Sequence, residues 1–216
     1  MADSPVNFSL YLISDRHRTG GRPLVAALRA AAEAGVRALQ LREKDLSPRE
    51  QYALAAEVTA ALGSLGTRTL INDRADIACA AGLAGVHLPS AGLSPAAARR
   101  CLPAGSLAAV STHTLAEARF AAEFGADFIT FGPVYPTPSK LAYGAPRGLE
   151  ELRQVCAAVQ IPVFALGGVT PARVPECLDA GAHGVAAIGA LLDVPSIPEA
   201  VAAFLDALDR APRDKA

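Results

Sequence analysis

Polar side chains that could bind an anion follow the second of the short apolar runs in this chain. Gln40, Arg42 and Lys44 alternate with other residues where the run over 36–41 ends. Alternate residues of an extended backbone point the same way, so an amide and two cations would face one site. This combination suits an anionic substrate that also accepts hydrogen bonds. The alternative for this segment is a solvated charged run that leads into a helix.

A single carboxylate stands at the equivalent place after the next run. Asp73 follows Asn72, where the apolar run over 68–71 ends. Mg²⁺ at a diphosphate is usually held by one or two carboxylates together with phosphate oxygens and water. A second carboxylate would come from the end of the run over 85–88, but residues 89–92 are Pro, Ser, Ala and Gly. We therefore predict at most a weak Mg²⁺ site at Asp73, and helix capping is an alternative role for this residue.

Glycines follow the last two apolar runs. Gly168 comes after the run over 163–166, and Gly189 comes after the run over 184–188. Because glycine has no side chain, its backbone N–H can approach a phosphate group closely. We expect a phosphorylated ligand here, with tight turns as the alternative reason for the two glycines.

A histidine and a long loop complete the polar set. Ser111 and His113 follow one another closely at the end of the run over 107–111. Histidine is the side chain that exchanges a proton near neutral pH. The segment over 132–140 is rich in proline and hydroxyl groups and contains Thr137, Ser139 and Lys140. Such a loop is more typical of a lid or a ligand-gripping segment than of a simple connection.

These candidates need a scaffold that brings the ends of several strands together. Apolar runs of strand length alternate with Ala- and Leu-rich stretches of helical period. We expect strands over 8–13, 36–41, 68–71, 85–88, 107–111, 128–132, 163–166 and 184–188. We expect helices near 22–34, 48–62, 74–81, 94–101, 114–124, 148–158, 170–179 and 197–209. Strand–helix units repeated in this way predict a single α/β domain over 1–216, a (β/α)₈ TIM barrel with its core over about 8–209 and a short flexible C-terminal tail.

Composition narrows the partners of this domain. Twenty basic residues nearly balance 21 acidic ones, for a net charge of −1. Nucleic acids and anionic membranes call for clustered positive charge, so we expect a small-molecule partner, no nucleic acid and no membrane. The N-terminus lacks the basic segment and long apolar stretch of a secretory signal, which predicts a cytoplasmic protein. Four cysteines without metal-ligand spacing are expected to be reduced core residues: Cys79, Cys101, Cys156 and Cys177.

In combination, several short motifs resemble those of the thiamine phosphate synthase/TenI family, from about Leu10 to Leu205. The motifs are the segments 11–15, 40–44, 72–74, 85–88, 111–113, 132–137, 167–168 and 184–190. This resemblance implies a TIM barrel that handles a thiazole phosphate, usually as a homodimer. It places ligand-binding residues at Gln40, Lys44, Asn72, Ser111, Thr137, Lys140, Gly168, Ile188 and Gly189.

Two departures from the family pattern separate its branches. In the synthases of this family, a Gly-Gln-x-Asp segment follows the His–Leu pair. The aspartate of this segment binds Mg²⁺ together with the aspartate equivalent to Asp73. Gly92 stands at that position, and Gly189 replaces the usual serine and keeps only its backbone donor. The segment over 87–90 resembles instead the TenI branch, the thiazole tautomerases, which need no metal.

We therefore expect a thiazole tautomerase without a cofactor. His113 would accept and donate the proton that moves when the thiazole becomes aromatic. His87 lies in an apolar strand and is expected to be structural. The cations Arg42, Lys44 and Lys140, with the backbone of the two glycines, would meet the substrate carboxylate and phosphate.

Two alternatives stay open. The first is a thiamine phosphate synthase, which joins hydroxymethylpyrimidine diphosphate to the thiazole phosphate and releases diphosphate. It would hold Mg²⁺ at Asp73, with an acid such as Glu43 or additional water compensating for the missing carboxylate. The second is a non-catalytic barrel that binds a phosphorylated ligand or regulates another process.

Overall fold

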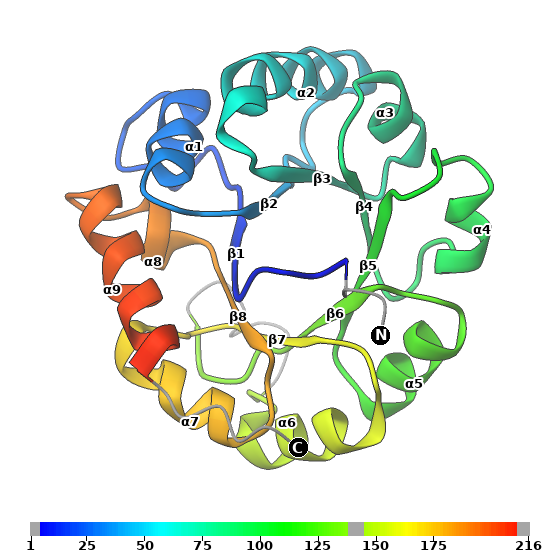
Figure 1. Ribbon diagram of the computed structural model, residues 1–216, viewed down its shortest axis with the longest axis vertical. Helices are drawn as coiled ribbons and strands as arrows, with labels where there is room; N and C mark the ends of the chain where they lie inside the picture. Colours follow the sequence, from blue (N-terminus) through cyan, green and yellow to red (C-terminus); the bar gives the residue numbers. More distant parts are fainter. Residues whose placement is uncertain (1–4, 138–144, 211–216) are drawn as a thin grey trace.

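The computed structural model describes residues 5–137 and 145–210, and its strands form one closed parallel barrel. Each strand pairs with the next along the chain, and β8 pairs with β1 to complete the ring. Figure 1 shows this inner ring of strands surrounded by an outer ring of helices. The expected (β/α)₈ TIM barrel is thereby confirmed. The strands are β1 Leu10–Ile13, β2 Ala38–Leu41, β3 Arg68–Asn72, β4 Gly85–Leu88, β5 Leu107–Thr112, β6 Phe128–Phe131, β7 Val163–Leu166 and β8 Gly184–Ala187.

The helices lie close to their predicted positions, with one addition. The short helix α8 directly follows β8 and was not expected from the sequence. Within the described residues, no helix is long and apolar enough to cross a membrane. The helices are α1 Leu24–Glu33, α2 Pro48–Leu62, α3 Ala75–Ala80, α4 Pro95–Arg99, α5 Leu115–Glu123, α6 Gly148–Ala158, α7 Val174–Asp179, α8 Gly189–Leu192 and α9 Ile197–Arg210, with 3-10 turns η1 Gly63–Leu65 and η3 Pro171–Arg173.

Local sequence signals explain where several helices begin. The Ser47 hydroxyl accepts a hydrogen bond from the Glu50 N–H, and the Glu50 carboxylate accepts one from the Ser47 N–H, so α2 starts at Pro48. Ser94 caps α4 by accepting from the Ala97 N–H. Thr170 differs, because its side chain makes no capping hydrogen bond and the chain enters the 3-10 turn η3 before α7.

The barrel interior is filled at the end where the strands begin. Val6 and Phe8 pack inside the barrel with Leu107 and Phe128, which stand at the first positions of β5 and β6. In Figure 1 the deep-blue segment before β1 crosses the middle of the ring. The outer faces of the strands pack against the helices in a second and larger apolar cluster. This arrangement leaves the carboxyl ends of the strands as the end at which a ligand site can form.

Two expectations about individual positions need correction. β1 begins at Leu10 rather than Phe8, because Phe8 is used to fill the end of the barrel. All four cysteines are free thiols, but only Cys177 is buried, whereas Cys79 and Cys101 are exposed. Those two therefore do not belong to the core. The C-terminal tail proposed from the sequence falls mostly outside the described residues, as α9 continues to Arg210.

Candidate active site at the barrel mouth

The last residues of β2 to β5 place polar side chains inside the barrel mouth. Ala38, Leu70 and Ala109 belong to the interior cluster, and Gln40, Asn72 and Ser111 follow them two residues later. Side chains two residues apart on a strand share one face of the sheet. The structure therefore brings these three predicted ligand residues to one end of the barrel, as the sequence analysis expected.

A buried histidine connects Ser111 to the opposite wall. His87 of β4 is fully buried, with its Nδ1 3.2 Å from the Tyr11 hydroxyl and its Nε2 2.9 Å from the Ser111 hydroxyl. Burial, and to a smaller extent the charge of Arg42, lower the pKa of His87 to about 3. The imidazole is neutral at physiological pH, so it donates at one nitrogen and accepts at the other. Its expected structural role is confirmed, but it also orients Ser111.

Gln40 places an almost fully buried amide beside Tyr11. Burial raises the pKa of the Tyr11 hydroxyl, and an interaction with the Gln40 side chain opposes that rise. The Gln40 Nε2 group nevertheless has no partner at hydrogen-bond distance in the described part of the chain. A buried amide without a partner costs free energy, so such groups are rare in folded proteins. At the end of β2 this group is well suited to donate to a bound ligand.

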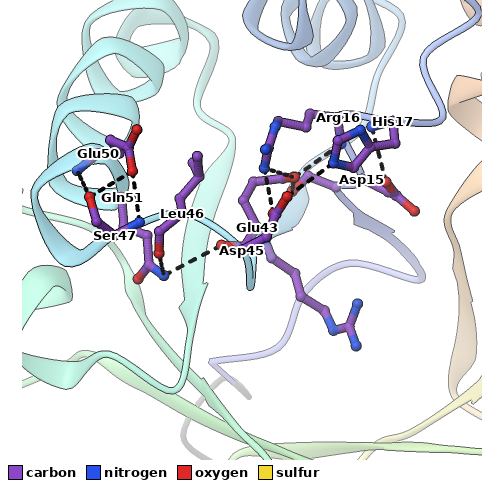
Figure 2. A network of polar contacts seen from close by, with 11 residues as sticks. Asp15, Arg16, His17, Glu43, Asp45, Leu46, Ser47, Glu50 and Gln51 are labelled. Atoms are coloured by element: carbon purple, nitrogen blue, oxygen red, sulfur yellow. Dashed lines mark hydrogen bonds and ion pairs between the residues drawn. The ribbon is translucent and has the colours of Figure 1, made fainter.

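A polar network joins the loop after β1 to the loop after β2 (Figure 2). The Ser14 hydroxyl donates to the buried Glu43 carboxylate at 2.5 Å and accepts from the Arg42 N–H at 2.8 Å. The Arg16 N–H donates to the other Glu43 oxygen at 3.1 Å. Hydrogen bonds from Arg16 and, with a smaller effect, from His17 lower the pKa of Asp45 to about 2. Glu43 is thus committed to holding the backbone at Arg42, which argues against its use as a replacement metal ligand.

Lys44 does not continue the alternation of Gln40 and Arg42. β2 ends at Leu41, and Lys44 lies in a turn closed by a hydrogen bond from the Leu46 N–H to the Glu43 carbonyl. The alternation rule holds only for extended backbone, so it fails beyond the strand. Lys44 lines a small cavity between the β2 and β3 ends together with Gln51 and Asn72.

Asp73 has an unusual backbone. Its φ is 61°, and it is the only non-glycine residue in the described part of the chain with a positive φ. Its N–H donates to the His87 carbonyl at 3.0 Å, which fixes it against β4. A Cβ placed on Gly92 would lie 3.2 Å from the Asp73 Oδ1 atom. Position 92 is therefore adjacent to the carboxylate, and the described residues contain no cluster of three or more His, Cys, Asp or Glu side chains arranged to hold a metal.

The turn after β7 requires glycine for packing as well as for backbone conformation. Gly168 has a φ of 66°, and a Cβ there would lie 2.7 Å from the Tyr135 Cβ and 2.8 Å from the Pro136 carbonyl oxygen. Its carbonyl accepts from Arg173 at 2.6 Å, and this guanidinium lies 4.4 Å from the Tyr135 ring centre. These contacts explain Gly168 without a ligand, so its phosphate-binding role stays a prediction.

The turn after β8 has a different character. Ile188 packs against the interior cluster, and Gly189 is buried and begins α8. A Cβ on Gly189 would lie 2.2 Å from the Arg18 Nη2 atom. Arg18, in the loop after β1, was not among the sequence-predicted site residues. Only its position against the turn that follows the neighbouring strand β8 identifies it, because no motif around residue 18 signals it.

His113 and the loop after β6 hold the remaining candidates. The His113 Nδ1 lies 2.6 Å from the Gly132 carbonyl oxygen and therefore donates its hydrogen, which leaves Nε2 as the acceptor. Its backbone N–H donates to the Glu117 carboxylate. Thr137 is half-buried at the end of the described part of this loop. The predicted residues Ser139 and Lys140 lie outside the described residues.

Comparison with known proteins now identifies the family. A family model described as thiamine monophosphate synthase matches residues 10–191. The chain belongs to this family. A Geobacter sulfurreducens relative, provisionally named a thiamine-phosphate synthase, is 51% identical over 210 residues, which cover 97% of this chain and 99% of the relative. A solved thiamine phosphate pyrophosphorylase from Pyrococcus furiosus has a TM-score of 0.83 at 30% identity, covering 93% of this chain and 95% of that one.

A second relative points the same way. The thiamine-phosphate synthase of Albidiferax ferrireducens is 40% identical over 182 residues, which cover 84% of this chain and 83% of the relative. The expectation of an enzyme of thiamine biosynthesis is confirmed at this level. The names favour the synthase alternative over the tautomerase, which was the leading expectation from the sequence.

Proposed function

We propose that this protein is a thiamine phosphate synthase. It would join hydroxymethylpyrimidine diphosphate to a thiazole phosphate and release diphosphate. The Geobacter and Albidiferax relatives, which align with most of the chain, carry this name, provisionally in the first case. The similar Pyrococcus structure is named a thiamine phosphate pyrophosphorylase, and none of the three is named a tautomerase. The tautomerase expectation depended on Gly92, on Gly189 and on the segment over 87–90, and glycine at position 92 leaves Asp73 in place.

The observation that carries this proposal is the conformation of Asp73. A left-handed backbone at a non-glycine residue is uncommon, and such positions cluster at functional sites. Here the left-handed turn holds an exposed carboxylate at the mouth, fixed through its N–H to β4. A metal-free proton transfer has no need of this carboxylate. Diphosphate chemistry with a cation does need it.

The donor set fits Mg²⁺ bound through one protein carboxylate. Asp73 would hold the ion, and substrate phosphate oxygens and water would supply the other ligands. When bound, Mg²⁺ would neutralise negative charge on the diphosphate leaving group. Gly92 offers no side chain, and Glu43 is occupied by Ser14 and Arg16. We therefore expect weak binding of Mg²⁺ to the free protein.

Side chains of the chain itself would orient the reactants. The unpartnered Nε2 of Gln40, the Asn72 amide and the Ser111 hydroxyl would hold a heterocycle by hydrogen bonds. Besides burial, the charge of Arg42 lowers the pKa of His87, so this cation lies near His87 of β4. This cation, with Lys44, would attract the diphosphate.

The other ligand contacts are predictions of the same kind. The backbone at Gly168, Ile188 and Gly189 would receive the thiazole phosphate, while Thr137, Ser139 and Lys140 would contact the diphosphate. A homodimer and a cytoplasmic location also stay predictions.

A two-arm assay tests the function. One arm supplies the purified protein with the thiazole phosphate, the pyrimidine diphosphate and Mg²⁺, and we expect thiamine phosphate to form. The other supplies the non-aromatic thiazole tautomer with EDTA, and we expect no conversion above the uncatalysed rate. Turnover confined to the EDTA arm would establish the tautomerase instead. Tight binding of thiazole phosphate without turnover in either arm would favour a non-catalytic barrel.

A further inference from the structure

Arg18 lies directly on the turn that follows β8. The Cβ position of Gly189 is 2.2 Å from the Arg18 Nη2 atom and 2.6 Å from its Cζ atom. Gly189 does not have a positive φ, so its backbone conformation does not demand glycine. A side chain at position 189 would therefore have to displace the Arg18 guanidinium from its place on the turn.

The guanidinium of Arg18 has N–H groups that make no hydrogen bond to the described residues. Its recorded side-chain partner is the Asp193 carboxylate, 3.8 Å from Nε, which is beyond ordinary hydrogen-bond distance. No hydrogen bond from this guanidinium to another described residue is present, and 41% of the side chain is exposed. Arg22 of the same loop is different, since it donates to the carbonyl oxygens of Thr19 and Pro195. Arg22 holds the loop in place, whereas Arg18 presents unused N–H groups at the mouth.

We propose that Arg18 binds the phosphate of the thiazole substrate, together with the backbone at Gly189. This inference rests on the proposed function, which places a thiazole phosphate at the β8 turn. A guanidinium matches phosphate oxygens with paired, charge-assisted hydrogen bonds. Gly189 gives the guanidinium room to lie flat against the turn, and the loop after β1 thereby supplies a ligand contact to the end of β8. The competing explanation is that the Arg18 side chain covers the turn and must move aside before an anion binds there.

Calorimetric binding distinguishes these two roles. Arg18→Ala should weaken binding of the thiazole phosphate by about 10- to 100-fold, because one charge-assisted contact is lost. Binding of the dephosphorylated thiazole alcohol should change by less than about twofold. Arg18→Lys keeps the charge without the paired geometry and should lie between these limits. Arg29→Ala is the matched control, since Arg29 pairs with Glu33 on the exposed face of α1 and its loss changes the net charge equally.

Steady-state kinetics give a second readout. The KM for the thiazole phosphate should rise with the binding loss in Arg18→Ala, while kcat stays within about threefold. In the double variant Arg18→Ala/Gly189→Ser, a hydroxyl enters the vacated space and should recover part of the phosphate affinity. Circular dichroism and thermal melting of each variant verify folding.

Two results would overturn the proposal. One is unchanged or tighter binding of the phosphate ester by Arg18→Ala, which the cover explanation expects. The other is an equal loss for the ester and the alcohol. Because binding needs no turnover, failure to form thiamine phosphate would reject the proposed function and still leave the ester-to-alcohol comparison to decide the role of Arg18.

Discussion

Gly92 and Gly189 follow strands β4 and β8, which lie four places apart in the ring of eight. Both stand where the family resemblance leads us to expect a polar side chain. At Gly92 a Cβ would meet the Pro89 ring at 2.9 Å and the Asp73 carboxylate at 3.2 Å. At Gly189 it would meet a guanidinium from another loop. In our proposal, the first glycine leaves Asp73 as the one carboxylate for a metal among the described residues, and the second makes room for the Arg18 guanidinium.

This difference shows that the loss of a polar residue has no fixed meaning in the sequence. Its consequence depends on which side chain occupies the vacated space. On the β4 side the proposed metal site has one carboxylate. On the β8 side the proposed phosphate site would use the Arg18 guanidinium in place of a hydroxyl. Four substitutions on the β4 side and its surroundings test this difference, and the Arg18 variants test the β8 side.

Removing the remaining carboxylate should have the largest effect. Asp73→Asn keeps the shape, and asparagine also tolerates a left-handed backbone, so the fold should survive. We expect kcat for thiamine phosphate formation to fall by about 10²- to 10³-fold, the size typical for loss of one group that stabilises developing charge. Asp76→Asn, on α3 and paired with Arg74, removes the same charge outside the mouth and should stay within about twofold of the unchanged protein. A loss of less than about threefold in Asp73→Asn would exclude metal chemistry at the β4 side.

Acid should destabilise the protein through His87. Its folded pKa is about 3 against 6.5 in the unfolded chain, so below pH 6.5 the unfolded state binds a proton that the native state does not. The free energy of unfolding should therefore fall by about 1.4 kcal/mol per pH unit on acidification from about 6.5 towards 3. Urea titrations between pH 7 and 5 should show a shallower dependence in His87→Gln, whatever its overall stability. Equal slopes in the two proteins would mean that His87 is not buried in its neutral form.

Restoring the missing carboxylate should create a dependence on metal. Gly92→Asp places a second negative charge beside Asp73, so without metal the melting temperature should drop through repulsion. With Mg²⁺ the melting temperature should recover, and Mg²⁺ should bind roughly tenfold more tightly than to the unchanged protein. Gly92→Asn is the matched control because it has the same size without the charge. The same response in both variants would point to crowding against Pro89 rather than to a metal site.

Replacing His113 should have the smallest effect if the protein is a synthase. His113→Asn keeps a side-chain donor for the Gly132 carbonyl while it removes the titrating group. We expect thiamine phosphate formation within about threefold of the unchanged protein, well below the loss of about 10²- to 10⁴-fold typical of a general acid–base residue. A loss in that larger range, with a flattened pH profile, would return the tautomerase mechanism to consideration.

The fold and part of the site could be predicted from the sequence alone. Strand and helix periods are local, so the eight apolar runs could be assigned as strands without distant contacts. Once a barrel is expected, the carboxyl ends of its strands must meet, and alternation puts Gln40, Asn72 and Ser111 at one mouth. The same rule failed at Lys44, where the strand had already ended.

The pairs of side chains that meet inside the barrel and at its mouth could be seen in the folded chain alone. Tyr11 and His87 are 76 residues apart in the chain, yet their side chains are hydrogen-bonded inside the barrel. Arg18 meets Gly189 because the ring closes β1 against β8. Such contacts depend on how the ring of strands closes, and no periodic pattern in the sequence near either residue signals them. For that reason the sequence showed glycine at positions 92 and 189, whereas only the folded chain showed that the Arg18 guanidinium lies beside Gly189.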